Sequence, residues 1–146
     1  MKRAIIYGVT LLLLFSMITG CNSTKNSTDY GVTIVSGKVE HTPIEQWIYS
    51  LSDGVAADGT RKQPQEVKYE LVEITVSGDF EIKVTGNVTG QPSYTLFYDD
   101  SFETVYYRND RFERPNDIGR YILCIEVAFG NDKEYEGYQY WFRIAV

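Results

Sequence analysis

Apolar and polar residues alternate with a period of two through much of the chain, a pattern typical of half-buried β-strands. Residues 80–84 alternate strictly, and residues 121–129 and 138–146 are longer runs in which large apolar residues recur at every second position. In the second run the residues expected on one face are Tyr121, Leu123, Ile125, Val127 and Phe129. In the third run they are Tyr138, Tyr140, Phe142, Ile144 and Val146. These long alternating runs predict the core strands of a mainly β domain.

Shorter runs add further strands and two hairpins. Val32 and Ile34 predict a first short strand. The alternation over residues 67–76 changes phase near Leu71, which predicts a bulged strand in a hairpin with residues 80–84. A second hairpin is expected where residues 94–98 and 102–107 flank a polar turn. The total of about seven strands predicts an antiparallel sandwich, with a jelly roll or small barrel as alternatives.

One segment carries a helical pattern instead. Thr42-Pro43-Ile44-Glu45 has the form of a capping box with proline at the first helical position. The apolar residues that follow have helical spacing: Ile44, Trp47, Ile48 and Leu51. We therefore expect one short helix after the first strand, ended by Ser52-Asp53-Gly54.

The segment Asp117-Ile118-Gly119-Arg120-Tyr121 resembles the D-x-G-x-Y run of immunoglobulin-like domains. The resemblance implies that the Tyr121 hydroxyl bonds back to the loop before it, forming a tyrosine corner. The usual Tyr-x-Cys is absent, because Cys124 stands three residues after Tyr121. The resemblance implies an immunoglobulin-like sandwich, a fold used more often for binding or spacing than for catalysis.

The N-terminus has the pattern of an export signal: Lys2 and Arg3, an apolar run over residues 4–18, and small residues before Cys21. Ile18-Thr19-Gly20-Cys21 resembles the lipobox of bacterial lipoprotein precursors. That resemblance implies cleavage before Cys21 and a diacylglyceryl lipid on its thiol. An uncleaved signal anchor, or a secretory signal followed by a chance cysteine, are the alternatives.

The lipobox sets the expected domain organisation and location. We expect a signal peptide at 1–20, the lipidated Cys21 and a polar tether at 21–30, and one sandwich domain at 31–146. The domain would be anchored by lipid on the extracytoplasmic side of the cell membrane. With Cys21 lipidated, Cys124 has no partner for an intramolecular disulfide.

Composition argues against several function classes. The 146 residues include 20 acidic and 14 basic residues, and a net charge of -6 disfavours nucleic acid as a partner. A single histidine and two cysteines leave little material for nucleophilic or metal chemistry, so we expect no enzyme, cofactor or metal. The acidic turn of Asp99, Asp100 and Glu103, with Asn116 and Asp117 as further ligands, could hold Ca²⁺. Its spacing matches no calcium loop, and a solvated turn is the favoured interpretation.

A segment rich in arginine and aromatic residues is the candidate binding site. Arginine and tyrosine are enriched at interface hot spots, and this segment carries both in an acidic chain. The candidate residues are Tyr107, Arg108, Arg111, Phe112 and Arg114. Local ion pairing with Asp110, Glu113 and Asp117 is the other interpretation of these arginines, and the near balance of charge in the segment favours it.

Together these features predict a non-enzymatic, lipid-anchored envelope protein whose domain binds a protein partner. The alternative is an accessory module that binds carbohydrate or another ligand of the cell wall. An aromatic platform on one sheet face would favour sugar, whereas a flat exposed edge or an Arg-Tyr loop would favour protein.

Overall fold

The structure, a computed structural model, describes residues 30–78 and 80–146. The predicted signal peptide, the lipobox residues Ile18, Thr19, Gly20 and Cys21, and the tether up to residue 29 lie outside the described residues.

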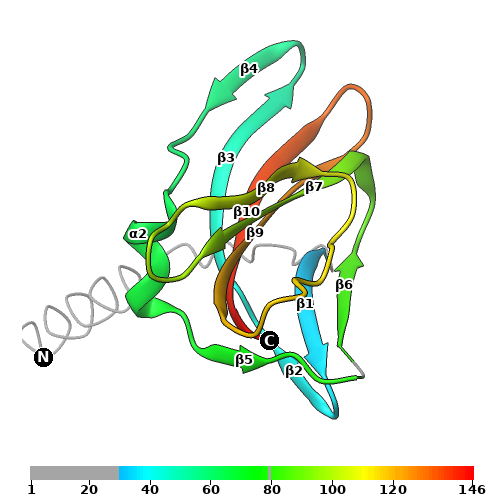
Figure 1. Ribbon diagram of the computed structural model, residues 1–146. Helices are drawn as coiled ribbons and strands as arrows, with labels where there is room; N and C mark the ends of the chain where they lie inside the picture. The colour runs from blue at the N-terminus through cyan, green and yellow to red at the C-terminus, as the bar shows by residue number, and fades with distance from the viewer. Residues whose placement is uncertain (1–29, 79) are drawn as a thin grey trace, which may run out of the picture.

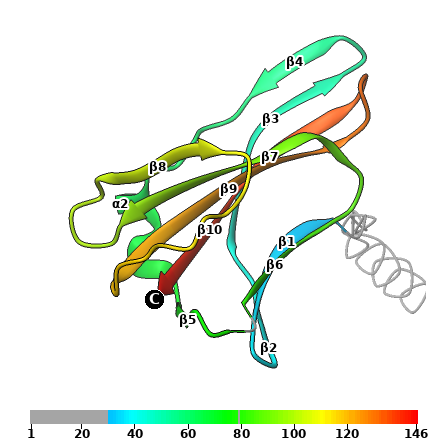
Figure 2. The same cartoon turned by 45° about the vertical axis from the view of Figure 1, so that its right-hand side comes forward.

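Two β-sheets, almost entirely antiparallel, form a curled, sandwich-like arrangement (Figures 1 and 2). The smaller sheet has the order β2 (Val39–His41), β1 (Gly31–Ser36) and β6 (Glu81–Thr85). The main path of the larger sheet is β4 (Val55–Asp58), β3 (Ile44–Ser52), β10 (Tyr135–Ala145), β9 (Arg120–Gly130), β7 (Val88–Tyr98) and β8 (Thr104–Asn109). β5 (Glu73–Thr75) pairs in parallel with β10, just beyond the residues of β10 that pair with β3.

The main core lies between the two sheets. Val32 and Ile34 of β1 pack there against the inner face of the larger sheet. That face carries the two alternating sets that the sequence predicts on β9 and β10, from Tyr121 to Phe129 and from Tyr138 to Val146. The predicted faces of these two strands are therefore confirmed, because a period of two leaves one face to the core along an unbroken strand.

The opposite, outer face of the larger sheet has a smaller core of its own. A short helix, α2 (Pro64–Val67), and a 3₁₀ turn, η1 (Lys68–Glu70), lie across one end of this face. Val67 is fully buried there against Ile122, Cys124 and Trp141. These elements cover one end of the outer face and leave the end toward the β9–β10 turn to polar and aromatic side chains.

The helix predicted after the first strand is wrong. Its residues form β3, which pairs with β10 along Ile44 to Leu51. Ile44 packs with the outer cluster, whereas Trp47 packs against the main core, so the predicted apolar stripe is divided between two faces. A helix of about ten residues is marginal alone, and the strand pairing and β-branched or aromatic side chains favour the sheet.

The predicted hairpin between residues 67–76 and 80–84 is also wrong. The first part of that segment forms α2 and η1, and only β5 is extended. β6 is a strand as expected, but it pairs with β1 instead of its sequence neighbour. The β7–β8 hairpin is confirmed. The described chain has ten strands where about seven were expected.

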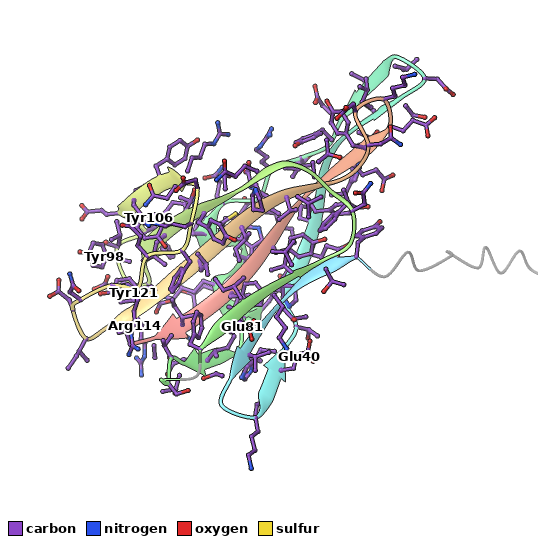
Figure 3. The ribbon with its side chains drawn as sticks, turned by 90° about the vertical axis from the view of Figure 1, so that its right-hand side faces the viewer. Glu40, Glu81, Tyr98, Tyr106, Arg114 and Tyr121 are labelled. Atoms are coloured by element: carbon purple, nitrogen blue, oxygen red, sulfur yellow. The ribbon has the colours of Figure 1, made fainter. Side chains whose placement is uncertain are left out.

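The predicted tyrosine corner is present as a contact. The Tyr121 hydroxyl donates a hydrogen bond to the Asp117 carbonyl at 2.9 Å. The loop of residues 110–119 is further held by Phe112, whose ring lies 5.3 Å from that of Phe80. Figure 3 shows Tyr98, Tyr106, Arg114 and Tyr121 gathered on the side of the molecule that this loop crosses.

Candidate functional site

The uncovered end of the outer face carries a cluster of charged and aromatic side chains. We call it the Arg-Tyr surface. It consists of Tyr49 on β3, Arg61 after β4, Tyr107 and Arg108 on β8, and Glu126 on β9. These residues come from four separate segments of the chain, which the strand order brings together.

Glu126 is the centre of this surface. Its carboxylate lies 3.6 Å from Arg61 Nε and 3.9 Å from Arg108 Nη2. It also accepts a hydrogen bond from the side-chain amide of Gln139 at 3.1 Å. Gln139 in turn accepts a hydrogen bond from the Lys62 backbone N–H at 2.9 Å, which attaches the segment carrying Arg61 to the sheet. The buried amide of Gln139 therefore fixes both the carboxylate and one of its cations.

Each arginine also lies over a tyrosine ring. The Arg61 guanidinium is 5.9 Å from the centre of the Tyr49 ring, and that of Arg108 is 5.1 Å from the Tyr107 ring. Both distances lie within the usual range of cation–π contacts. Each guanidinium group is therefore in contact with an aromatic ring at the surface.

The backbone positions Arg108 through an irregularity in β8. The β7–β8 register shifts between Tyr94 and Leu96, and Arg108 has a φ of 52°. Its backbone N–H donates to Thr95 Oγ1 at 3.2 Å, which stabilises this left-handed conformation. Such bulges redirect a side chain out of the regular alternation, and here the arginine is directed toward Glu126.

The two arginines retain much of their binding capacity. Their side chains are 45% and 52% exposed, and the Glu126 side chain is 22% exposed. Within the described chain neither guanidinium donates a hydrogen bond that meets ordinary geometry, because both pairs with Glu126 are long. Two planar cations facing one carboxylate leave a local excess of positive charge. This arrangement is suited to carboxylate or phosphate groups, which match the guanidinium fork.

Titration behaviour reflects the burial beneath this surface. Burial, and then the negative charge of Glu126, raise the pKa of the Tyr49 hydroxyl. The same causes raise the pKa of Cys124 well above that of a free thiol, so the side chain stays protonated. Cys124 is buried, as expected, and a buried protonated thiol is a weak nucleophile.

The five predicted binding residues are divided by the structure. Tyr107 and Arg108 belong to the Arg-Tyr surface. Phe112 packs against the main core beneath its loop. Arg111 pairs with Glu113 at 3.4 Å, and Arg114 donates to the Val76 carbonyl at 3.4 Å. The loop arginines therefore lie apart from the arginines on Glu126.

The predicted local ion pairing accounts for one of these arginines. Only the pair between Arg111 and Glu113 joins residues of the same segment. Arg108 pairs with Glu126, and Arg120 pairs with Glu73 at 2.8 Å. The arginines of this region therefore interact mainly with carboxylates that are distant in sequence.

The acidic hairpin tip has a different role from the calcium site considered above. Asp99 is only 6% exposed and receives two hydrogen bonds from Arg143, at 3.0 Å and 2.8 Å. Lys68 Nζ lies 3.4 Å from the same carboxylate. Asp99 is thus neutralised by two cations, which leaves little attraction for Ca²⁺. Among the described residues no group of three or more metal-ligating side chains is placed to hold a metal.

Sequence reasoning missed Tyr49, Arg61, Glu126 and Gln139 of the site. Glu126 interrupts the outward-facing apolar positions of the run at 121–129, and Gln139 does the same in the run at 138–146. A polar residue on each of two adjacent buried strands was the available signal. Their partner Arg61 is 65 positions from Glu126, so only the strand pairing could place it.

No helix of the described chain is long and apolar enough to cross a membrane. Comparisons with protein-family models, with curated proteins and with solved structures each give no match for this chain.

Proposed function

We propose that the protein is a lipid-anchored binding domain of the bacterial cell envelope, without enzymatic activity, which captures a protein partner through the Arg-Tyr surface. The observation that carries the proposal is the pair of half-exposed arginines, each over a tyrosine ring, that share the single carboxylate of Glu126. Arginine and tyrosine side chains that are held in place by their neighbours are typical hot-spot residues of protein interfaces. The matching partner surface carries carboxylate groups.

The anchor half of the proposal is supported by the sequence. Ile18-Thr19-Gly20-Cys21 follows an apolar run of export-signal length. Two or three acyl chains on Cys21 would bind a bilayer firmly, at about 0.8 kcal/mol for each buried methylene. The tether then allows the acidic domain to extend away from an anionic bilayer surface.

We further propose that the domain is a divergent immunoglobulin-like sandwich. The order β8-β7-β9-β10 corresponds to the C′-C-F-G order of that family, and Tyr121 occupies the place of the corner tyrosine at the start of strand F. The chain departs from the family in three respects. β3 and β4 continue the sheet beyond β10, which would be its strand G. The loop of residues 110–119 replaces the strands expected before F, and Cys124 cannot form the disulfide between the sheets.

Cross-linking on intact membranes tests the binding proposal. We expect the double variant Arg61→Ala/Arg108→Ala to lose partner cross-links that the native chain forms, because both guanidinium forks are removed. Arg111→Ala is the matched control, since Arg111 is 78% exposed and pairs only with Glu113 among the described residues. If Arg111→Ala or Arg114→Ala lost the cross-links and the double variant kept them, the binding site would lie on the loop of residues 110–119.

A carbohydrate of the cell wall is the second candidate ligand. The observation in its favour is the Tyr49 ring, which lies directly over Gly137, where a β-carbon would be 2.3 Å from the ring. Tyr135 stands beside it, with ring centres 6.1 Å apart. Binding to purified cell-wall glycan that is lost in Tyr49→Ala but kept in Arg61→Ala/Arg108→Ala would favour this candidate.

A further inference from the structure

A cavity of about 450 Å³ lies at one end of the sandwich, and Glu126 is not among the residues that line it. Its walls come from β3, from the β9–β10 turn, from the connection between β6 and β7, and from Tyr30 at the start of the described chain. It is the size of a small organic molecule's site.

The walls of this cavity are mainly apolar and aromatic. Tyr30, Phe129, Tyr135 and Leu51 line it, and the rings of Tyr30 and Phe129 stack at 4.8 Å. Gly86 permits that stack, because a β-carbon there would lie 2.4 Å from Tyr30. The close approach of the Gly86 backbone to Tyr30 therefore shapes this wall of the cavity.

The charged groups that line the cavity are both carboxylates. Glu134 and Glu136 lie at the cavity, and no lysine or arginine of the described chain lines it. Across residues 30–78 and 80–146, neither carboxylate forms a salt bridge. An aromatic wall next to unneutralised carboxylates is attractive to a cation.

A chain of hydroxyl groups orients one of these carboxylates. The Tyr138 hydroxyl donates to Glu136 Oε2 at 2.5 Å. That hydroxyl has a single proton, so the Tyr30 hydroxyl, 2.9 Å away, must be the donor in the contact with Tyr138. Glu136 Oε1 has no hydrogen-bond partner in the described chain and is available to a ligand.

We infer that this cavity binds an organic cation, an alkylammonium group carried on a small apolar body. The aromatic rings and Leu51 would bury the alkyl groups, while Glu134 and Glu136 would face the positive charge. The ligand differs in charge from the partner proposed for the Arg-Tyr surface, so the inference does not rest on the proposed function.

Amide NMR of the full ¹⁵N-labelled chain in a non-ionic detergent tests the inference. The probes are choline and 3,3-dimethylbutan-1-ol, its uncharged analogue of the same shape. We expect choline to shift the amide signals of Gly86 and Gly130, and the alcohol to bind at least about tenfold more weakly. Equal affinity for the two probes, or no shift with choline, would overturn the inference.

Two variants keep the test specific to the carboxylates. Glu134→Gln and Glu136→Gln should each weaken choline binding several-fold while leaving affinity for the alcohol unchanged. Glu134→Gln is the safer variant, because it leaves the hydrogen bond from Tyr138 in place. Glu81→Gln, on β6, is the control and should bind choline like the native chain. Unchanged binding in both cavity variants would contradict a role for the carboxylates.

Discussion

Asp99 shows how much of the fold can depend on one buried side chain. Arg143 comes from β10 and Lys68 from η1, so their contacts with Asp99 join the outer elements to the larger sheet. Lys68 also donates to the Asp99 carbonyl at 2.6 Å. Such an arrangement is stable only while charges of both signs are present.

Asp99→Asn removes the negative charge at nearly constant volume. We expect it to lower the free energy of unfolding by about 3–5 kcal/mol, because Lys68 would be left partly buried without its counter-charge and Arg143 would keep only the long contact of 3.9 Å with Glu73. Urea unfolding followed by circular dichroism measures the change. Glu113→Gln, which breaks the exposed pair with Arg111, should change stability by less than about 1 kcal/mol. A similar loss in both variants would contradict this account.

The buried tyrosine hydroxyls predict a loss of stability in alkali. Burial, with lesser contributions from neighbouring groups, raises the pKa of Tyr106 to about 12 and raises the pKa of Tyr138 and Tyr140 further. The unfolded chain ionises near pH 10, so it binds fewer protons than the folded chain above that pH. Stability is therefore complete below about pH 10 and is lost as pH rises through the raised pKa values.

Urea midpoints at pH 9, 10 and 11 check this expectation. The native chain should lose stability over the upper part of that range. Tyr106→Phe should lose stability less steeply with pH, because it lacks one of the hydroxyl groups whose pKa is raised in the folded chain. Tyr69→Phe is the control, because Tyr69 is 90% exposed. If the urea midpoint fell equally steeply with pH in Tyr106→Phe and in the native chain, the loss of stability would come from other groups.

Among the elements, β5 contributes to the stability of the main core although it has only three residues. It pairs in parallel with β10 and places Ile74 in the main core at 3% exposure. Ile74→Ala should lower the free energy of unfolding by about 2–5 kcal/mol, as for other large-to-small core changes. Val72→Ala is the matched control, because Val72 is 77% exposed two residues away. Thermal unfolding of both variants gives the comparison.

The sequence predicted best those strands in which the spacing of apolar residues within the strand itself identifies the buried face. β9 and β10 have eleven residues each, with the large core residues at every second position, so the face turned to the main core could be assigned before any pairing was known. β3 could not be assigned in this way. The register with β10 shifts between Trp47 and Tyr49, so Ile48 is an extra residue in β3. This bulge changes the alternation of β3 and gives Ile44, Trp47 and Ile48 an accidental helical spacing.

The start of α2 has its own signal in the sequence. Gln63-Pro64-Gln65-Glu66 has proline at the first helical position and glutamate two residues later. The Gln63 backbone N–H donates to Glu66 Oε2 at 2.6 Å, which is one half of a capping box. Glutamine at the cap position is uncommon, and the following residues alternate like a strand, so the pattern favoured the wrong element.

The candidate site was predictable only in part, for a related reason. Tyr107 and Arg108 stand in a segment whose composition is unusual, and composition is visible in the sequence. Arg61, Glu126 and Gln139 meet them only because β3, β10, β9 and β7 lie in that order. Tyr30 and Tyr138, whose hydroxyl groups are in contact behind the cavity, are likewise 108 positions apart.

For the whole molecule, the anchor is the decisive prediction. Cys21→Ala should abolish incorporation of an alkyne-labelled fatty acid and leave an unprocessed precursor, because the acceptor thiol is missing. Gel fluorescence and intact mass measure the two effects. Cys124→Ala is the control and should label normally, since Cys124 is buried in the folded domain. Normal labelling and processing of Cys21→Ala would contradict the lipoprotein assignment.

The position of β10 in the larger sheet has a consequence for the timing of folding. β10 pairs with β3, β5 and β9, so strands from early, middle and late parts of the chain all depend on residues 135–145. A chain that leaves a ribosome or a translocation pore from its N-terminus presents β10 last. Until then β3 and β5 lack the neighbour that completes their hydrogen bonds, and such distant pairings form slowly. The larger sheet is therefore completed only after β10 has emerged, because β3, β5 and β9 all pair with it.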